Sequence, residues 1–156
     1  FLIHLAGNGK MLPEEIGLFK KKILDENYSF VNGSRFLPNG RFKTNPIGRI
    51  IMIKVLSFFI SLIYLRRITD ATCGFRAFKI NLFKNFLSTL DQKKFYTYRY
   101  EYYSLGKVLL NKKIKFTEIP VTMEYTKKNY SKIRPIIDWV PLIFGWIEAF
   151  VDGKKL

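Results

Sequence analysis

Apolar positions recur with two different spacings along the chain, and these spacings predict alternating strands and helices. Short continuous apolar runs are typical of buried strands, whereas apolar residues three and four positions apart predict helices. The predicted strands cover residues 1–5, 28–32, 75–78 and an extended segment at 113–125, in which Pro120 indicates a sheet edge. The predicted helices cover residues 13–24, 47–65, 81–90, 95–113 and 133–151. Strands that alternate with helices in this way indicate an α/β domain.

Two of the predicted helices are apolar over most of their circumference. In the first, the polar side chains fall on one narrow stripe, formed by Lys54, Ser57, Ser61 and Tyr64. In the second, a stripe holds Arg134, Asp138, Gly145 and Glu148. Pro141 is expected to kink this second helix. Both apolar stretches are shorter than the roughly 20 residues of a membrane span, so we expect these helices to lie along a membrane surface or inside a soluble core.

Composition and charge fit one folded domain with an anionic partner. The chain has 156 residues, of which 48% are hydrophobic and 25% charged, which is enough to bury a core. Phe1 already lies inside an apolar strand-like run, and we therefore expect further sequence before it. The net charge of +15 predicts a phosphorylated ligand, an anionic lipid surface or a nucleic acid as partner. No repeated basic and aromatic motif supports the nucleic acid.

Cysteine and histidine usage excludes two classes of site. Cys73 is the only cysteine and His4 the only histidine in the sequence. An intrachain disulfide and a cysteine–histidine metal cluster are therefore impossible. We expect Cys73 to be a small packing residue and His4 to lie in the core or at the edge of the first strand.

Four local patterns follow one another along the chain. The first, "AGNGKMLPEEI" at residues 6–16, ends an apolar run at two glycines and begins a helix with proline and two glutamates. The others are "NGSRF" at 32–36, "TDATCGFRAF" at 69–78 and "KFTEIPVTMEYTKKNYSKI" at 115–133. Their order resembles the family-two glycosyltransferases of the GT-A fold. The resemblance is greatest to the branch that transfers sugars to dolichyl or undecaprenyl phosphate.

This resemblance implies a fold and a domain organisation. It runs through nearly all of the sequence and matches the second half of a GT-A domain, a mixed sheet flanked by helices. Residues 1–132 would form the C-terminal part of that domain, and residues 133–156 would form an amphipathic helix at the membrane surface. The half that holds the nucleotide base would precede Phe1.

The resemblance also implies a metal site, which this sequence does not preserve. In the family the strand tip carries Asp-x-Asp, whose carboxylates hold Mg²⁺ or Mn²⁺ against the donor diphosphate. These aspartate positions match Ala6 and Asn8, and a following polar position matches Lys10. Ala6 has no ligand atom, and Asn8 offers one neutral oxygen. Two alternatives follow: Lys10 and Asn8 face the diphosphate without a conventional metal site, or the site has lost catalysis.

The resemblance assigns other charged residues to phosphate groups. Arg35 and Arg49 match arginines that hold the acceptor phosphate, because the guanidinium fork fits phosphate oxygens. Asp70 matches an acidic position that serves as general base for a hydroxyl acceptor and is dispensable for a phosphate acceptor. Arg76 would pair with Asp70 or bind the acceptor, and Lys132 would close on the diphosphate. Each residue also has a structural alternative. Arg35, Arg49 and Lys132 would then be solvent-exposed, Asp70 would be a turn residue, and Arg76 would form a structural ion pair.

Together these patterns predict an inverting glycosyltransferase with a nucleotide-sugar donor and a polyprenyl-phosphate or saccharide acceptor. We expect a peripheral protein on the cytoplasmic face of a membrane, with Trp139 and Trp146 at the interface and basic residues against anionic lipid. Glu101 and Glu118 are expected to make buried hydrogen bonds. The alternative is an inactive scaffold of the same fold that binds lipid phosphate or a partner protein.

Overall fold

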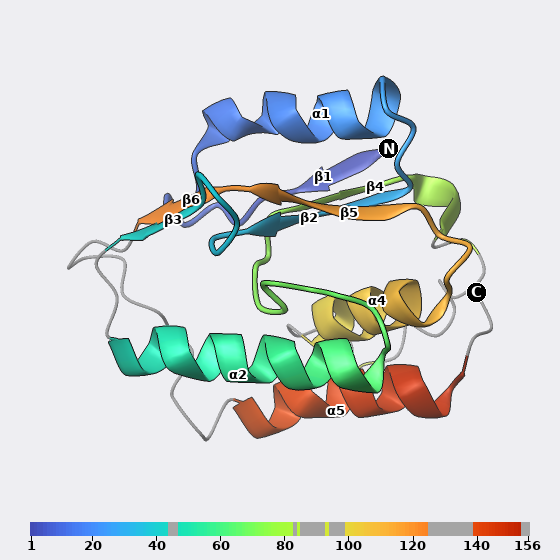
Figure 1. Ribbon diagram of the computed structural model, residues 1–156. Helices are drawn as coiled ribbons and strands as arrows, with labels where there is room; N and C mark the ends of the chain where they lie inside the picture. The colour runs from blue at the N-terminus through green and yellow to red at the C-terminus, as the bar shows by residue number, and fades with distance from the viewer. Residues whose placement is uncertain (44–46, 83, 85–92, 94–98, 125–138, 154–156) are drawn as a thin grey trace.

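A four-stranded mixed sheet forms the middle layer of the molecule (Figure 1). In spatial order its strands are β1 (Leu2–His4), β4 (Arg76–Phe78), β2 (Phe30–Ser34) and β5 (Phe116–Pro120). Strand β4 is antiparallel to both neighbours, whereas β2 and β5 are parallel. The computed structural model describes residues 1–43, 47–82, 84, 93, 99–124 and 139–153. Within them, the predicted α/β class and mixed sheet are confirmed.

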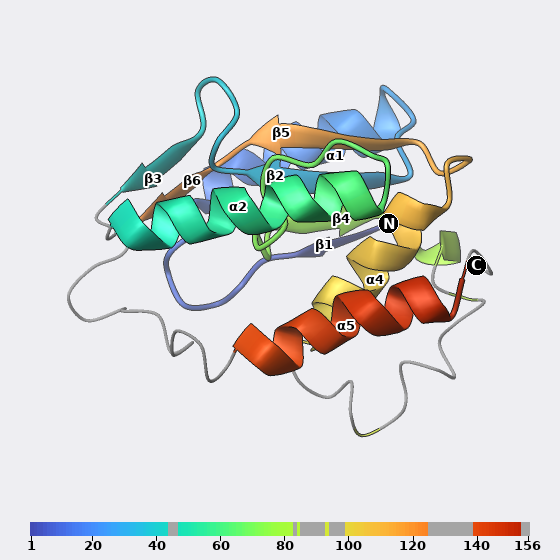
Figure 2. The same cartoon turned by 60° about the horizontal axis from the view of Figure 1, so that its bottom comes forward.

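Helices cover both faces of this sheet. The short turn η1 (Pro13–Glu15) leads into α1 (Ile16–Leu24), which lies on one face (Figure 1). The other face is covered by α2 (Ile47–Ile63), α4 (Arg99–Leu110) and α5 (Trp139–Val151) (Figure 2). A second, two-stranded parallel sheet joins β3 (Arg41–Lys43) to β6 (Thr122–Glu124), and η2 (Ile80–Leu82) follows β4.

Several boundaries differ from the sequence-based expectations. Residues 33–46, expected to be a loop, contain the end of β2 and all of β3. The extended segment at 113–125 is two strands, β5 and β6, and Pro120 ends β5 at the edge of the larger sheet, as predicted. Pro141 lies near the start of α5 as described, and because residues 133–138 lie outside the described residues, the expected kink there stays a prediction. Most of the helix expected at 81–90 lies outside the described residues. The same holds for residues 133–138 of the helix expected at 133–151.

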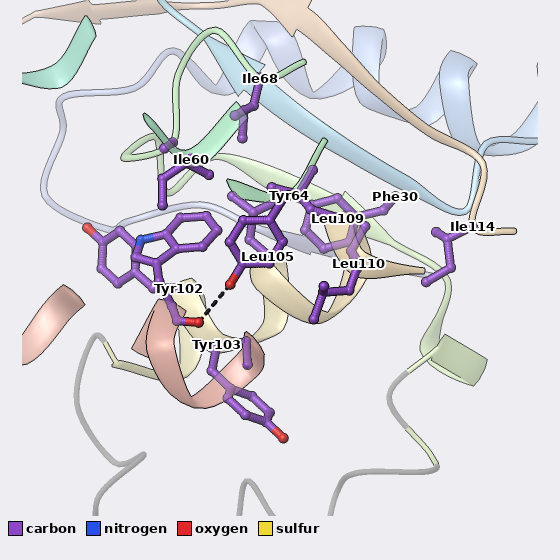
Figure 3. Packing of buried hydrophobic residues seen from close by; sticks show 14 residues of the cluster. Phe30, Ile60, Tyr64, Ile68, Tyr102, Tyr103, Leu105, Leu109, Leu110 and Ile114 are labelled. Carbon is purple, nitrogen blue, oxygen red and sulfur yellow. Dashed lines mark hydrogen bonds between the residues drawn. The ribbon is translucent and has the colours of Figure 1, made fainter. Parts of the chain in front are cut away.

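The sheet separates two hydrophobic cores, because successive side chains of a strand point to opposite faces. Toward α1, Phe19 and Ile23 pack against Val31, Phe75 and other buried side chains of the strands. Toward α2, α4 and α5, the core contains the residues labelled in Figure 3, among them Phe30, Tyr64, Tyr102, Tyr103 and Leu109.

Three of the four residues of the predicted polar stripe, Ser57, Ser61 and Tyr64, face the protein, whereas Lys54 is exposed. The Ser57 hydroxyl accepts a hydrogen bond from the Ala71 N–H at 3.0 Å, and the Ser61 hydroxyl bonds both backbone groups of Ile68. Tyr64 donates to the Trp146 carbonyl at 2.7 Å, the dashed line in Figure 3. The outer face of α2 is therefore apolar, with exposed Ile47, Ile51, Met52, Val55, Phe58, Phe59, Leu62 and Ile63.

Helix α5 likewise turns small and polar residues toward the protein and large apolar side chains outward. Gly145 and Ala149 pack closely on α4, and Glu148 forms an ion pair with Arg99 at 2.6 Å. Trp146 is only 4% exposed, so the expectation that it lies at a membrane interface is wrong. The outer side chains are Ile143, Phe144, Ile147, Phe150 and Val151. In the described part of the chain, no helix is both long enough and apolar enough to cross a membrane.

Candidate functional site

The segment that follows β1, which we call the β1 tip (residues 5–12), is fastened to β6. The Glu124 N–H donates to the Lys10 carbonyl at 2.9 Å, and Met11 forms an antiparallel bridge with Met123. Within the tip, the Asn8 side-chain oxygen accepts the Lys10 N–H at 3.3 Å. Gly9 between them has φ of 68°, a conformation that glycine adopts without strain. Lys10 is consequently held at a fixed place and is only 8% exposed.

A buried ion pair lies on the other side of β6. The Arg35 guanidinium, just after β2, donates from Nε and Nη2 to the two oxygens of Asp70 at 2.5 and 2.6 Å. Nη2 also reaches the Thr72 hydroxyl at 2.6 Å, and the guanidinium carbon lies 4.3 Å from the Phe42 ring centroid. Arg35 is 4% exposed and Asp70 is fully buried.

Met123 connects this pair to the β1 tip. Its sulfur accepts a hydrogen bond from Arg35 Nη1 at 3.4 Å, and its backbone forms the antiparallel bridge with Met11. Lys10 and Arg35, which are far apart in the sequence, therefore both contact β6, and Asp70 is joined to this strand through Arg35. Asp70 pairs with Arg35, which corrects the expectation that Arg76 would be its partner.

A row of four polar residues crosses the sheet at equal register, and we call it the polar row. Strand pairing aligns His4 with Arg76, Arg76 with Asn32, and Asn32 with Glu118. Arg76 Nε donates to the Asn32 side-chain oxygen at 3.1 Å, and the Asn32 amide donates to Glu118 at 3.1 Å. His4 lies at the end of the row, in the edge strand β1 as expected, with Nε2 3.1 Å from the Tyr100 hydroxyl.

The polar row holds the segment that carries Asp70. Glu118 accepts the Thr69 N–H and hydroxyl, each at 2.7 Å, and the Asp70 N–H at 3.3 Å. The Asn32 amide donates to the Asp70 carbonyl at 2.9 Å. Burial raises the pKa of the Glu118 carboxyl, although these donors oppose the shift. The predicted buried hydrogen-bonding role of Glu118 is confirmed.

Arg76 carries a buried polar atom that the protein leaves unsatisfied. The residue is 3% exposed, its Nη1 donates to the Glu101 carbonyl at 2.6 Å, and its Nη2 makes no hydrogen bond within the described structure. Buried donors are normally satisfied, so an unsatisfied one needs an explanation such as a ligand or water that binds there. Glu101 is itself 9% exposed, and its carboxylate would contact a side chain placed at Gly74, at 3.2 Å from that Cβ.

The predicted phosphate-binding roles of Arg49 and Lys132 stay predictions. Arg49 lies half-buried in the first turn of α2. Lys132 lies outside the described residues, and so its predicted contact with the diphosphate stays a prediction. Cys73 is fully buried beside the pair, and burial, helped by the Asp70 charge, raises the pKa of its thiol to about 12. Its predicted role as a packing residue is confirmed.

The β1 tip does not offer the donors that a divalent cation needs. Ala6 has no ligand atom, and the Asn8 oxygen already accepts the Lys10 N–H. Among the described residues, no group of three or more histidine, cysteine, aspartate or glutamate side chains is placed to hold a metal ion. The residues present therefore do not fit the Mg²⁺ or Mn²⁺ site that the sequence resemblance implies.

Sequence reasoning missed Asn32, Thr69 and Thr72 as parts of the cluster. Asn32 gave only a weak signal as the polar last residue of the predicted strand 28–32, since a polar residue that becomes buried there must find partners. The two threonines gave no such signal, since hydroxyl residues are common in any loop. Their contacts with Glu118 and Arg35 depend on the strand register, which short strands do not reveal from sequence.

Comparison with known proteins identifies one informative similarity. The chain is 29% identical over 133 residues, 85% of its length, to UDP-N-acetylglucosamine–dolichyl-phosphate N-acetylglucosaminyltransferase of Methanococcus voltae. It spans about half the length of this curated relative. No protein-family model matches the sequence, and no solved structure matches it. The similarity supports a glycosyltransferase.

Proposed function

We propose that this chain is all or part of an enzyme that transfers a sugar from a nucleotide-sugar donor to a polyprenyl phosphate. The observation that carries this proposal is the closed Arg35–Asp70 pair. Asp70 has no exposed surface and both of its oxygens accept Arg35 donors, so it is not presented as a base to an acceptor hydroxyl. A phosphate acceptor needs no base, because its oxygen is already an anion at neutral pH. The relative's name, which includes dolichyl phosphate, agrees with this choice.

The proposed step is an in-line displacement at the anomeric carbon of the sugar. A phosphate oxygen of the acceptor forms the new bond to this carbon as the bond to the donor diphosphate breaks. The electron pair of the broken bond leaves with the nucleoside diphosphate, and the anomeric configuration inverts. No proton has to move, which suits a site where the Asp70 carboxylate is held in an ion pair.

The basic residues divide between the two phosphate-bearing substrates. Lys10 and Asn8 at the β1 tip face the donor diphosphate, and Lys132 closes over it. Arg76, with its unsatisfied Nη2, and Arg49, at the start of α2, bind the acceptor phosphate. Arg35 acts through Asp70, because its guanidinium is committed to the ion pair, and it positions residues 69–72.

The outer faces of α2 and α5 fit an enzyme that takes its acceptor from a lipid surface. The two helices lie on the same side of the sheet, opposite α1 (Figure 2). Their exposed side chains are mostly large and apolar, and contiguous exposed apolar surface marks a binding face. We propose that this face rests on the membrane as a peripheral anchor, and the net positive charge of the protein adds attraction to anionic lipid.

A transfer assay on the full-length protein tests the proposal. Labelled UDP-N-acetylglucosamine is mixed with vesicles that carry polyprenyl phosphate, or polyprenol as a matched acceptor without phosphate. The proposal expects glycosylated lipid from the phosphate only. Transfer to polyprenol or to a soluble saccharide would contradict it.

The loss of both metal-binding aspartates favours a second candidate, an inactive scaffold that binds lipid phosphate. This candidate predicts vesicle binding that rises with the polyprenyl-phosphate content but no transfer from any nucleotide sugar. The same assay separates the two candidates when bound protein and glycosylated product are measured together.

A further inference from the structure

We propose that the protein binds the diphosphate of its donor without a divalent cation, with the charge of Lys10 in the cation's place. This inference rests on the proposed function, because it concerns the donor of that reaction. It goes further by naming the source of the positive charge and by removing a cofactor that the sequence resemblance implies.

The first support is that three carboxylates near the β1 tip, those of Asp70, Glu15 and Glu124, already have partners within the protein. Asp70 binds Arg35 through both oxygens, and Glu15 accepts the Thr122 N–H with both of its oxygens, at 2.8 and 3.0 Å. Glu124 forms an ion pair with Lys43. A cation that recruited any of these groups would have to break a contact that fastens the tip or its neighbouring strands.

The second support is the shape of the tip itself. The only candidate ligand on the former aspartate positions is the Asn8 oxygen, and that oxygen caps the Lys10 N–H in a local turn. A neutral amide oxygen is a weak ligand for a hard cation without carboxylates beside it. The Asn8 side-chain oxygen thus stabilises the turn of the β1 tip by accepting the Lys10 N–H.

The third support is the charge that replaces the aspartates. Three consecutive alternate positions, 6, 8 and 10, carry no negative charge and one positive charge. Lys10 is 8% exposed, and charges interact more strongly there than in bulk water. A lysine ammonium at this position repels a divalent cation and attracts a diphosphate, which lysine binds as a point charge.

A spectroscopic titration tests the absence of a cation site directly. The signal of free Mn²⁺ in electron paramagnetic resonance falls when the ion binds to protein. We expect the wild-type chain to leave this signal unchanged at millimolar Mn²⁺. The triple variant A6D/N8D/K10Q, which restores two carboxylates and removes the ammonium, is expected to bind Mn²⁺. Binding of Mn²⁺ by the wild type at the β1 tip, lost in N8A, would overturn the inference.

Calorimetric titration tests the role of Lys10 with two probes, inorganic pyrophosphate and UDP-N-acetylglucosamine. We expect each affinity to agree within about twofold between buffers with EDTA and with Mg²⁺. Lys10→Gln is expected to weaken both by at least tenfold, about 1.4 kcal/mol, and Lys10→Arg to retain most of the binding. Lys21→Gln, on exposed α1 surface, is the matched control and should leave both affinities unchanged.

The outcomes separate this inference from the proposed function. Binding that requires Mg²⁺ would refute the inference while the proposed function stands. Binding that persists in EDTA and survives Lys10→Gln unchanged would also refute it. If neither probe binds the full-length protein in either buffer, the inference and the proposed function both fail.

Discussion

At the scale of single residues, the centre of the candidate site is a buried charge pair. Arg35 and Asp70 are almost wholly removed from water, and further polar contacts surround the pair, among them those of the Thr72 hydroxyl and the Arg35 N–H. A buried charge that loses its partner is strongly destabilising, because its desolvation is no longer compensated. The ion pair therefore holds residues 69–72 in place at the candidate site.

Removal of one charge of this pair should destabilise the fold severely. Asp70→Asn leaves the Arg35 charge buried, and we expect the free energy of unfolding to fall by about 3–5 kcal/mol. The double variant R35M/D70L, which removes both charges, should lose much less than the sum of the two single variants. Urea unfolding measures all of them, and a loss below about 0.5 kcal/mol for D70N would show that the pair is not as enclosed as described.

The buried thiol gives a second prediction at this scale. Burial raises the pKa of the Cys73 thiol to about 12, whereas the reactive form of cysteine is the thiolate. At pH 8 we expect iodoacetamide to leave the folded protein unlabelled and to label the urea-unfolded protein fully, as measured by mass spectrometry. Rapid labelling under native conditions at pH 8 would contradict the buried position. Labelling of the native state should increase only as the pH approaches 12.

At the scale of elements, the close packing of α4 against α5 depends on small residues. A Cβ placed on Gly106 would lie 2.6 Å from the Ala149 Cβ and 2.8 Å from the Tyr64 hydroxyl oxygen. A Cβ on Gly145 would lie 2.8 Å from the Arg99 carbonyl oxygen. These contacts let α5 approach α4 with its small and polar side inward, which turns its apolar side outward.

Alanine at two glycines should therefore act in opposite directions. Gly106→Ala forces α4 and α5 apart and should lower the free energy of unfolding by about 1–3 kcal/mol. Gly17→Ala, in α1, meets nothing within 4 Å and should raise it by about 0.5–1 kcal/mol, because alanine is the better helix former. Thermal and urea unfolding of both variants check this prediction, and equal effects would contradict the packing of α5 on α4.

The sequence predicts most elements but not their orientation. The spacing of apolar residues over 47–65 correctly predicted helix α2, because a long periodic segment is the most reliable sequence indication of a helix. Which face of α2 turns inward could not be predicted, since nearly all of its surface is apolar and the inner partners of Ser57 and Ser61 are backbone groups of 68–71. Strands β3 and β6 have three residues each, too few to show an alternating pattern.

The contacts among the candidate site residues could not be predicted from the sequence, and their function stays a prediction. The motifs around the β1 tip, Arg35 and Asp70 indicated one region, and the structure brings these residues together around β6. The partner of Asp70 depended on strand register, which placed Arg76 beside Asn32 instead. The sequence could not distinguish these two arginines as partners of Asp70, because Arg35 follows β2 and Arg76 begins β4 close to Asp70 in the sequence.

At the scale of the whole molecule, the described structure has two unlike sides. Helix α1 lies on one side of the sheet, and α2 and α5 lie on the other (Figure 2). The exposed side chains of α1 are charged residues and isolated leucines, whereas those of α2 and α5 are mostly large and apolar. A net charge of +15 adds attraction to anionic lipid surfaces. These features agree with a protein that rests on a membrane through α2 and α5.

Charged substitutions on the two sides should affect lipid binding differently. Phe58→Asp with Phe59→Asp places two charges on the outer face of α2 and should reduce vesicle co-sedimentation at least tenfold. The matched control is Leu18→Asp with Leu24→Asp on α1, where the side chains are 46% and 51% exposed, and its binding should be unchanged. If the first variant alters only self-association in light scattering, the face is a contact between protein copies and not with lipid.

The central claim is that the β1 tip, Arg35, Asp70 and Arg76 surround one site for a nucleotide-sugar diphosphate. The most direct test is a crystal structure of the full-length protein with UDP-N-acetylglucosamine bound in the presence of EDTA. The account predicts the diphosphate within hydrogen-bond distance of residues 8–10, with Asp70 still paired to Arg35. A diphosphate bound on another face of the molecule, or coordinated through a metal ion at Asn8, would contradict it.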